Sequence, residues 1–149
     1  MCETISSLPY KKWVRSVMHF IKPEMILPGN WFLYEYYSEP EDELIHYREN
    51  FLKENNLFWE IILEKEGLFR QRSNLPVRFL HNCQLCRWKI SGNYLKIGTA
   101  QNDNSKEEFQ IAILKDSIRL LKKDISGRII FFGFFRKKDI YSNNILTLE

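Results

Sequence analysis

The sequence predicts an all-β protein: an antiparallel up-and-down β-barrel of about nine strands, preceded by one N-terminal helix. Three observations support this. A helix-like opening ends at Gly29-Asn30-Trp31. Short runs of alternating apolar and polar residues then follow one another, each bounded by turn residues. A sheet with so many strands closes into a barrel, because closure removes its exposed edges. We expect the barrel over about residues 30–137.

A single domain accounts for the whole sequence, 1–149. Of the 149 residues 44% are apolar and 28% are charged, which is enough for one sizeable core. The first 30 residues carry several charges and no long apolar run, so we expect neither a signal peptide nor a membrane span. Three cysteines do not fit a secreted disulfide framework. Residue types with AT-rich codons are abundant, which favours a compact genome such as that of a plastid or of an AT-rich bacterium. We therefore expect a soluble protein of the plastid stroma or the cytoplasm, not a secreted one.

An amphipathic helix is predicted over about residues 8–21. Ser6 or Ser7 can cap its first turn, which contains Pro9. One face is apolar, and it carries Trp13, Val17 and Phe20 or Ile21. We expect this helix to plug or buttress one end of the barrel. Attachment to a membrane surface is the alternative, which the short basic face disfavours, so we expect no membrane partner.

The hairpin around Gly92-Asn93 can be paired residue by residue. A two-residue loop places Ile90 opposite Leu95 and Trp88 opposite Ile97, so these apolar side chains share one face. Trp88 is therefore predicted to point into the barrel.

Two further hairpins give apolar inner faces in the same way. A loop at Lys115-Asp116 pairs Ile113 with Ile118 and Ile111 with Leu120, and Phe109 extends this stripe. A three-residue loop at Lys65-Glu66-Gly67, with glycine in the left-handed position, sets Glu60 against Arg72 on the outside. The inward residues of that hairpin are Trp59, Ile61, Leu63, Phe69 and Gln71.

Three more strands are predicted over residues 31–37, 44–52 and 128–136. The last of them is apolar on both faces. A shift of one residue exchanges Phe131 and Phe135 with Phe132 and Phe134, so the sequence does not decide which pair points inward.

The charge of the chain is unevenly distributed. Residues 35–66 hold ten acids and three bases, whereas residues 67–98 hold six bases and no acid. Such a dipole can orient a partner, although pairing of neighbouring strands across signs is the simpler interpretation. The formal net charge of +3 is too small for the basic footprint of a nucleic-acid-binding protein, so we expect no nucleic-acid partner.

No motif identifies a catalytic residue. Cys83-Gln84-Leu85-Cys86 has the spacing of a metal-binding turn, but a second pair of ligands is missing, so we expect no metal site. Cys86 is interpreted as a small apolar group in the barrel wall. The sequence shows no Ser-His-Asp order and no Gly-rich phosphate loop.

A helix followed by Gly29-Asn30-Trp31 and a series of strands resembles the lipocalin/calycin barrels. In that family the tryptophan of the first strand seals the barrel floor and an arginine of the last strand lies against it. Here these residues would be Trp31 and Arg136.

Within this superfamily the chain is most similar to the S-type phycobiliprotein chromophore lyases, as a short, diverged member. The similarity rests on the tryptophan segment, on Ser117-Ile118-Arg119-Leu120 and on Phe134-Phe135-Arg136. The sequence departs from the family at Leu33, Glu35 and Leu121, where the family has polar or arginine residues.

The resemblance implies that the protein binds a linear tetrapyrrole, a phycobilin, and assists its thioether attachment to a cysteine of a phycobiliprotein subunit. The bilin is then a bound substrate, and no cofactor is expected. A flat pigment with two propionates needs aromatic walls and cationic anchors. We nominate Trp59, Trp88, Tyr94 and Phe109 as wall residues, with Phe132 and Phe134 as further ones, and Arg119 and Arg136 as anchors. No catalytic residue is named, because the nucleophile belongs to the acceptor and the acceleration comes from orientation.

Two other functions remain open. The barrel is a non-catalytic carrier or sensor of a small hydrophobic ligand, or its lumen is filled and its outer wall binds a protein. A homodimer or a second lyase subunit is a further partner that the family resemblance suggests.

Overall fold

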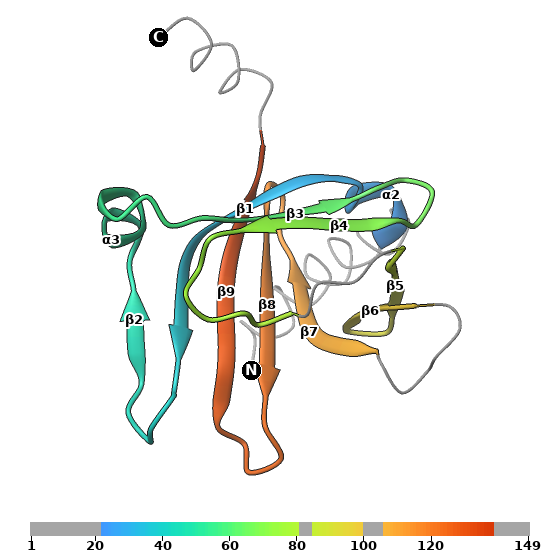
Figure 1. The fold of residues 1–149 in the computed structure, drawn as a ribbon. Helices are drawn as coiled ribbons and strands as arrows, with labels where there is room; N and C mark the ends of the chain where they lie inside the picture. Colours follow the sequence, from blue (N-terminus) through green and yellow to red (C-terminus); the bar gives the residue numbers. More distant parts are fainter. Residues whose placement is uncertain (1–21, 81–84, 100–105, 139–149) are drawn as a thin grey trace, which may run out of the picture.

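The computed structural model describes residues 22–80, 85–99 and 106–138 and shows an antiparallel barrel (Figure 1). The prediction of an all-β fold is confirmed. Two short helices, α2 (Pro23–Ile26) and α3 (Glu49–Glu54), belong to the described residues, and the helix expected over residues 8–21 lies outside them. The strands are β1 (Gly29–Ser38), β2 (Ile45–Tyr47), β3 (Trp59–Leu63), β4 (Phe69–Ser73), β5 (Arg87–Ser91), β6 (Tyr94–Gly98), β7 (Glu107–Ile113), β8 (Ser117–Lys123) and β9 (Ile129–Lys137).

The sheet closes almost completely on itself. Its order, β4-β3-β1-β9-β8-β7-β6-β5, pairs the first strand with the last, and β2 adds to the side of β1. The two ends of this order, β4 and β5, meet at a bridge between Leu68 and Arg87. Beside it, Phe69 N–H donates a hydrogen bond of 2.8 Å to Cys86 O. The result is a nearly closed barrel of eight strands in up-and-down order, with β2 as an extension.

All three predicted hairpin registers are confirmed. The Gly67 backbone has a φ of +97°, the left-handed conformation that the three-residue loop requires. The aligned pairs include Ile90 with Leu95, Trp88 with Ile97, Ile113 with Ile118, Ile111 with Leu120, and Glu60 with Arg72.

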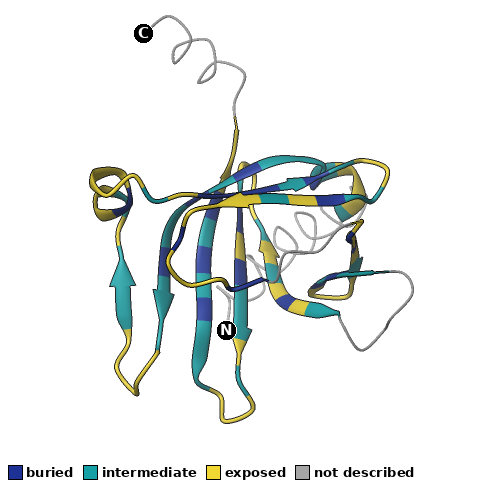
Figure 2. Ribbon diagram, in the orientation of Figure 1, coloured by how far each residue is buried: buried dark blue, intermediate teal, exposed yellow. Residues whose placement is uncertain are grey.

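The structure decides which face of β9 points inward. Phe131 and Phe135 are fully buried, whereas Phe132 and Phe134 point to the outside and are half-buried, an alternation visible along the strand in Figure 2. Gly133 lies on the inner face between the two buried rings. A Cβ atom there would lie 2.1 Å from Cζ of Phe131, so the missing side chain is what admits that ring.

A bulge in β1 matches this arrangement. Its register against β9 shifts between Leu33 and Glu35. Leu33 and Tyr36 therefore both point inward and are buried, although they are three residues apart. Tyr37, next to Tyr36, points to the outer face and pairs with Phe132.

One predicted strand is wrong over most of its length. The strand expected over residues 44–52 is reduced to β2, and its second half belongs to α3. Helical spacing allows an i,i+4 ion pair of 3.2 Å between Glu49 and Lys53, and it turns Leu52 inward, where 3% of it is exposed. The pairing with β1 ends at Tyr47.

The interpretation of Cys86 is also corrected. The residue is buried, as a wall group would be, but it forms a disulfide. The other two cysteines of the sequence lie outside the described residues. An odd number of cysteines does not reveal from spacing alone which two of them pair.

Candidate functional site

Trp31 lies at one end of the barrel, which we term the floor. Its side chain is fully buried, and its indole N–H donates a hydrogen bond of 2.8 Å to Leu27 O. The expected stacking of Arg136 on this ring is wrong, because the inward position of Phe135 turns Arg136 to the outside. Lys137 takes its place, with Nζ 5.6 Å from the Trp31 ring centroid.

The eight side chains nominated for ligand binding do not converge. Three lie inside the barrel and five on its outer surface: Trp59, Trp88 and Phe109 inside, and Tyr94, Arg119, Phe132, Phe134 and Arg136 outside. Tyr94 is 40% exposed. The guanidinium carbon of Arg119 lies 5.2 Å from the Phe134 ring on the outer face, because its neighbours Ile118 and Leu120 point inward. Neither nominated arginine therefore supplies a cation to the interior.

Aromatic rings pack tightly in the middle of the barrel. The ring centroid of Trp59 lies 5.2 Å from that of Phe131 and 5.5 Å from that of Phe135, both edge-on. Phe109 approaches Phe131 in the same way at 6.4 Å. These are the contacts of a well-packed core, so side chains occupy this part of the interior.

The other end of the barrel, where β3 begins and β4 ends, is different, and we term it the mouth. Here a ring from a connecting segment enters the barrel. Phe79, in the connection from β4 to β5, has its ring centroid 4.6 Å from Phe131, 5.6 Å from Tyr36 and 6.2 Å from Trp59. These three wall rings form an aromatic cage around a residue that belongs to no strand.

A cavity of about 190 Å³ lies beside Phe79, between the end of β4 and the connecting segment. Gln71 lines it, accepting a hydrogen bond of 2.9 Å from the Trp59 indole N–H and donating one of 3.4 Å to Leu80 O. Arg78 lines it as well and is exposed. Arg78 makes no hydrogen bond or ion pair with any residue that the structure describes, so its guanidinium is available to a ligand.

The cage is neutral at physiological pH. Burial raises the pKa of Tyr36 to about 12, and the neighbouring Tyr47 hydroxyl adds to this effect. The two rings are stacked, with centroids 4.4 Å apart. In the part of the chain that the structure describes, the mouth is therefore a neutral aromatic site with Arg78 at its rim, a combination that suits a flat apolar molecule bearing an anionic group.

The outer charges pair only in part. Arg72 Nε lies 3.1 Å from a carboxylate oxygen of Glu60 across β3 and β4, as expected for pairing across signs. On β5 and β6, however, Lys89 stands directly opposite Lys96, which reaches Glu108 on β7 at 3.6 Å. Ion pairs therefore neutralise the outer charges on β3 and β4 more fully than those on β5 and β6.

Of the residues at the mouth, Trp59 is nominated from the sequence as a wall residue, whereas Phe79 and Arg78 are not singled out. Phe79 and Arg78 follow the polar loop that contains Pro76, and no strand periodicity includes them. The available signal was the apolar pair Phe79-Leu80 directly after this loop, which is unusual for a solvated connection.

Comparison with known protein families, with curated proteins and with solved structures finds no match to this chain. In residues 22–80, 85–99 and 106–138, no three His, Cys, Asp or Glu side chains gather in a way that would hold a metal ion. The same residues include no helix with the length and apolar character needed to span a membrane.

Proposed function

We propose that the protein binds a linear tetrapyrrole of the phycobilin class at the mouth of its barrel and assists the thioether attachment of this pigment to a cysteine of a phycobiliprotein subunit. The position of Phe79 carries the proposal. Its ring comes from a connecting segment and lies among Tyr36, Trp59 and Phe131. A flat ring of a ligand makes the same contacts once the segment moves outward. The resemblance to S-type chromophore lyases supports the choice of pigment.

The size of the site sets how the pigment lies. The cavity of about 190 Å³, enlarged by the space of the Phe79 ring, accommodates one end of a tetrapyrrole and not the whole molecule. Arg78 at the rim pairs with a propionate through a charge-assisted hydrogen bond. The other end of the pigment then remains outside the mouth, where an acceptor can reach it.

The chemistry requires orientation more than a catalytic group. The acceptor's thiolate sulfur adds to the ethylidene carbon of ring A, so a carbon–sulfur bond forms and the carbon–carbon π bond breaks. A proton from solvent completes the adduct, and nothing leaves. Holding the pigment by one end brings the two reacting atoms together, which accelerates such an addition without a covalent enzyme intermediate.

The test is a titration of the purified protein with phycocyanobilin and with phycoerythrobilin, followed by addition of a bilin-free acceptor subunit. We expect a shifted visible band on binding and a covalent product on transfer. Phe79→Ala opens the cage and tightens binding several-fold. Arg78→Gln weakens it about tenfold, the loss of one charged hydrogen bond. Arg70→Gln is the matched control, since Arg70 pairs with Glu64 at 2.7 Å and lies away from the mouth.

Three outcomes distinguish the alternatives. If the visible absorption band of the bilin does not shift when the protein is added, for either bilin, the proposal is overturned. A band without transfer to any acceptor indicates a carrier, and displacement of the pigment by fatty acids indicates a carrier of broad specificity. If Phe79→Ala and Arg78→Gln leave the affinity unchanged while transfer proceeds, the mouth is not the binding site.

A further inference from the structure

The outer faces of β1 and β9 carry a second set of aromatic side chains. Tyr34 and Tyr37 from β1 and Phe132 and Phe134 from β9 are half-buried and contact one another, and we term them the outer aromatic surface. The centroids of Phe132 and Phe134 are 4.8 Å apart, and Tyr37 lies 6.1 Å from each. The solvated face of an antiparallel sheet normally alternates to polar residues. A contiguous aromatic group there marks a site of contact with another molecule.

Two arginines lie over these rings. The guanidinium carbon of Arg136 is 3.8 Å from the Tyr34 ring centroid, and Arg136 donates a hydrogen bond of 2.8 Å to Glu49. Arg119 lies over Phe134 and has no carboxylate partner among the described residues. Stacking leaves its hydrogen-bond donors unused, so a carboxylate of another molecule can pair with it. Aromatic rings with arginine are typical of the energetically dominant part of protein interfaces.

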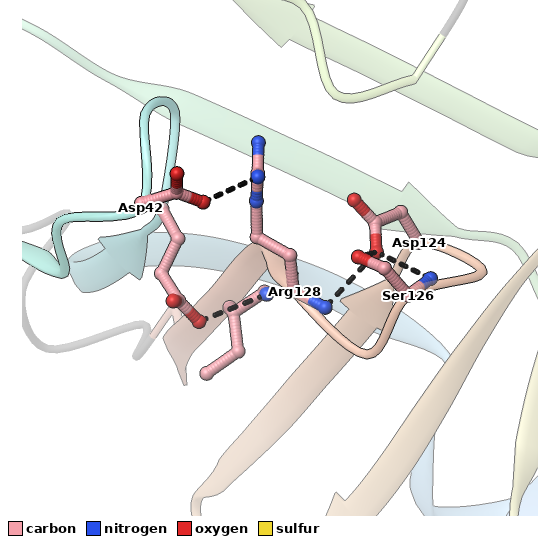
Figure 3. A network of polar contacts seen from close by, with 6 residues as sticks. Asp42, Asp124, Ser126 and Arg128 are labelled. Carbon is pink, nitrogen blue, oxygen red and sulfur yellow. Dashed lines mark hydrogen bonds and ion pairs between the residues drawn. The ribbon is translucent and has the colours of Figure 1, made fainter.

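The surface is held in one geometry. His46 of β2 stacks on Tyr37 with ring centroids 4.1 Å apart. Figure 3 shows the ends of the strands tied together: Arg128, after the β8–β9 turn, binds Asp42 of the β1–β2 connection, and its backbone N–H donates to Asp124 at 2.9 Å. Because the stacking on His46 already restricts the Tyr37 side chain, ordering Tyr37 on binding a partner costs less conformational entropy.

We infer that this surface docks the acceptor protein of the reaction proposed above, through an amphipathic helix that carries a carboxylate beside its apolar row. An apolar sheet face is stable when another element buries it, and a helix with an apolar side is one element that does so. The inference rests on the proposed function for the identity of the partner and on the surface for its chemistry.

Charge argues against two other occupants of this surface: the helix predicted at the N-terminal end of this chain, and a second copy of the chain. The helix predicted over residues 8–21 contains Lys11, Lys12 and Arg15 and no acidic residue, so it offers no carboxylate to Arg119. A second copy of the chain, joined symmetrically through this surface, would bring two copies of Arg119 toward each other. An acidic helix from a different protein has neither conflict.

The position of the surface suits transfer. Tyr36 and Tyr37 are neighbours on β1, and Phe131 and Phe132 are neighbours on β9, so cage and surface lie back to back across the barrel wall. An acceptor docked on the outside therefore lies one sheet thickness from the cage.

The test measures binding of the full chain, without bilin, to a bilin-free acceptor subunit by titration calorimetry. We expect Arg119→Glu and Phe134→Ser each to weaken this binding about tenfold or more, while both variants keep the bilin band of the wild type. Lys89→Glu is the matched control: it makes the same charge change on β5 and leaves the affinity unaltered. A Glu→Arg change in the acceptor helix restores binding to Arg119→Glu.

Unchanged acceptor affinity in both variants would overturn the inference. A photo-crosslinking phenylalanine analogue at position 134 gives a second measurement. A product with the acceptor supports the inference, whereas a crosslink within the chain or to a second copy overturns it. The titration needs no bilin and is read separately from the bilin band, whose absence would overturn the proposed function alone.

Discussion

The inner and outer faces of β1 and β9 are both aromatic, but different surroundings hold their rings. Inside, Phe131 and Phe135 are fully buried and contact Trp59 of β3. Outside, Phe132 and Phe134 contact mainly each other and two tyrosines of β1, and they stay half-buried. Hydrophobic stabilisation grows with the area removed from water, so the inner rings hold the fold together. The outer rings retain apolar area for binding, and residue type alone does not distinguish the two roles.

The largest difference in unfolding free energy between the two faces is expected between the variants Phe131→Ala and Phe132→Ala. Removing the Phe131 ring leaves a cavity among several rings, which costs about 3–5 kcal/mol of unfolding free energy. Removing the half-buried Phe132 ring costs less than about 1 kcal/mol. Urea denaturation followed by circular dichroism measures both, with the wild-type m-value as the check on cooperativity. Equal losses for the two variants would contradict the division into core and surface.

Substitution of Gly133 tests the packing of the inner face, with a smaller expected loss of stability than Phe131→Ala. Because Cβ of Gly133→Ala would lie 2.1 Å from Cζ of Phe131 and 3.0 Å from Cδ1 of Leu33, one of these side chains must move. We expect a loss of about 1–3 kcal/mol, as for other overpacked cores. The background Phe131→Leu provides the control: there the same change costs less, because the ring that it meets is absent. Additive losses in the double variant would show that the clash is not the cause.

The sequence predicted the local pairings well, because they depend on local rules. A loop of known length fixes the partners of a hairpin, and alternation then places Trp88 and Phe109 inside. The inner face of β9 followed no such rule, since both of its faces are apolar. It depends on Gly133 and on the bulge near Leu33, two features that matter only when β1 and β9 meet.

The alternation of apolar and polar residues could not predict the candidate site, for a related reason. Phe79 and Arg78 belong to a connecting segment, whose path depends on what the finished barrel leaves uncovered. Conversely, Arg119 and Arg136 were nominated as pigment anchors from their place in short motifs, and strand alternation turns both to the outside. A motif can identify an arginine, but only the parity of its buried neighbours decides on which side of the wall it lies.

The smallest expected effect concerns the electrostatics of the outer face. The hydrogen bond from Arg136 lowers the pKa of Glu49 below its ordinary value of 4.5, and Lys53 contributes further. A carboxylate whose pKa is lower in the folded state contributes stability above the ordinary value and loses it as pH falls through the folded value. The unfolding free energies of the wild type and Glu49→Gln, measured in urea, should therefore differ at pH 7 by less than about 1 kcal/mol and converge once the pH falls below the folded-state pKa of Glu49. A difference that persists at low pH would mean that Glu49 acts through packing of α3, and the outer face would then share the structural role of the inner one.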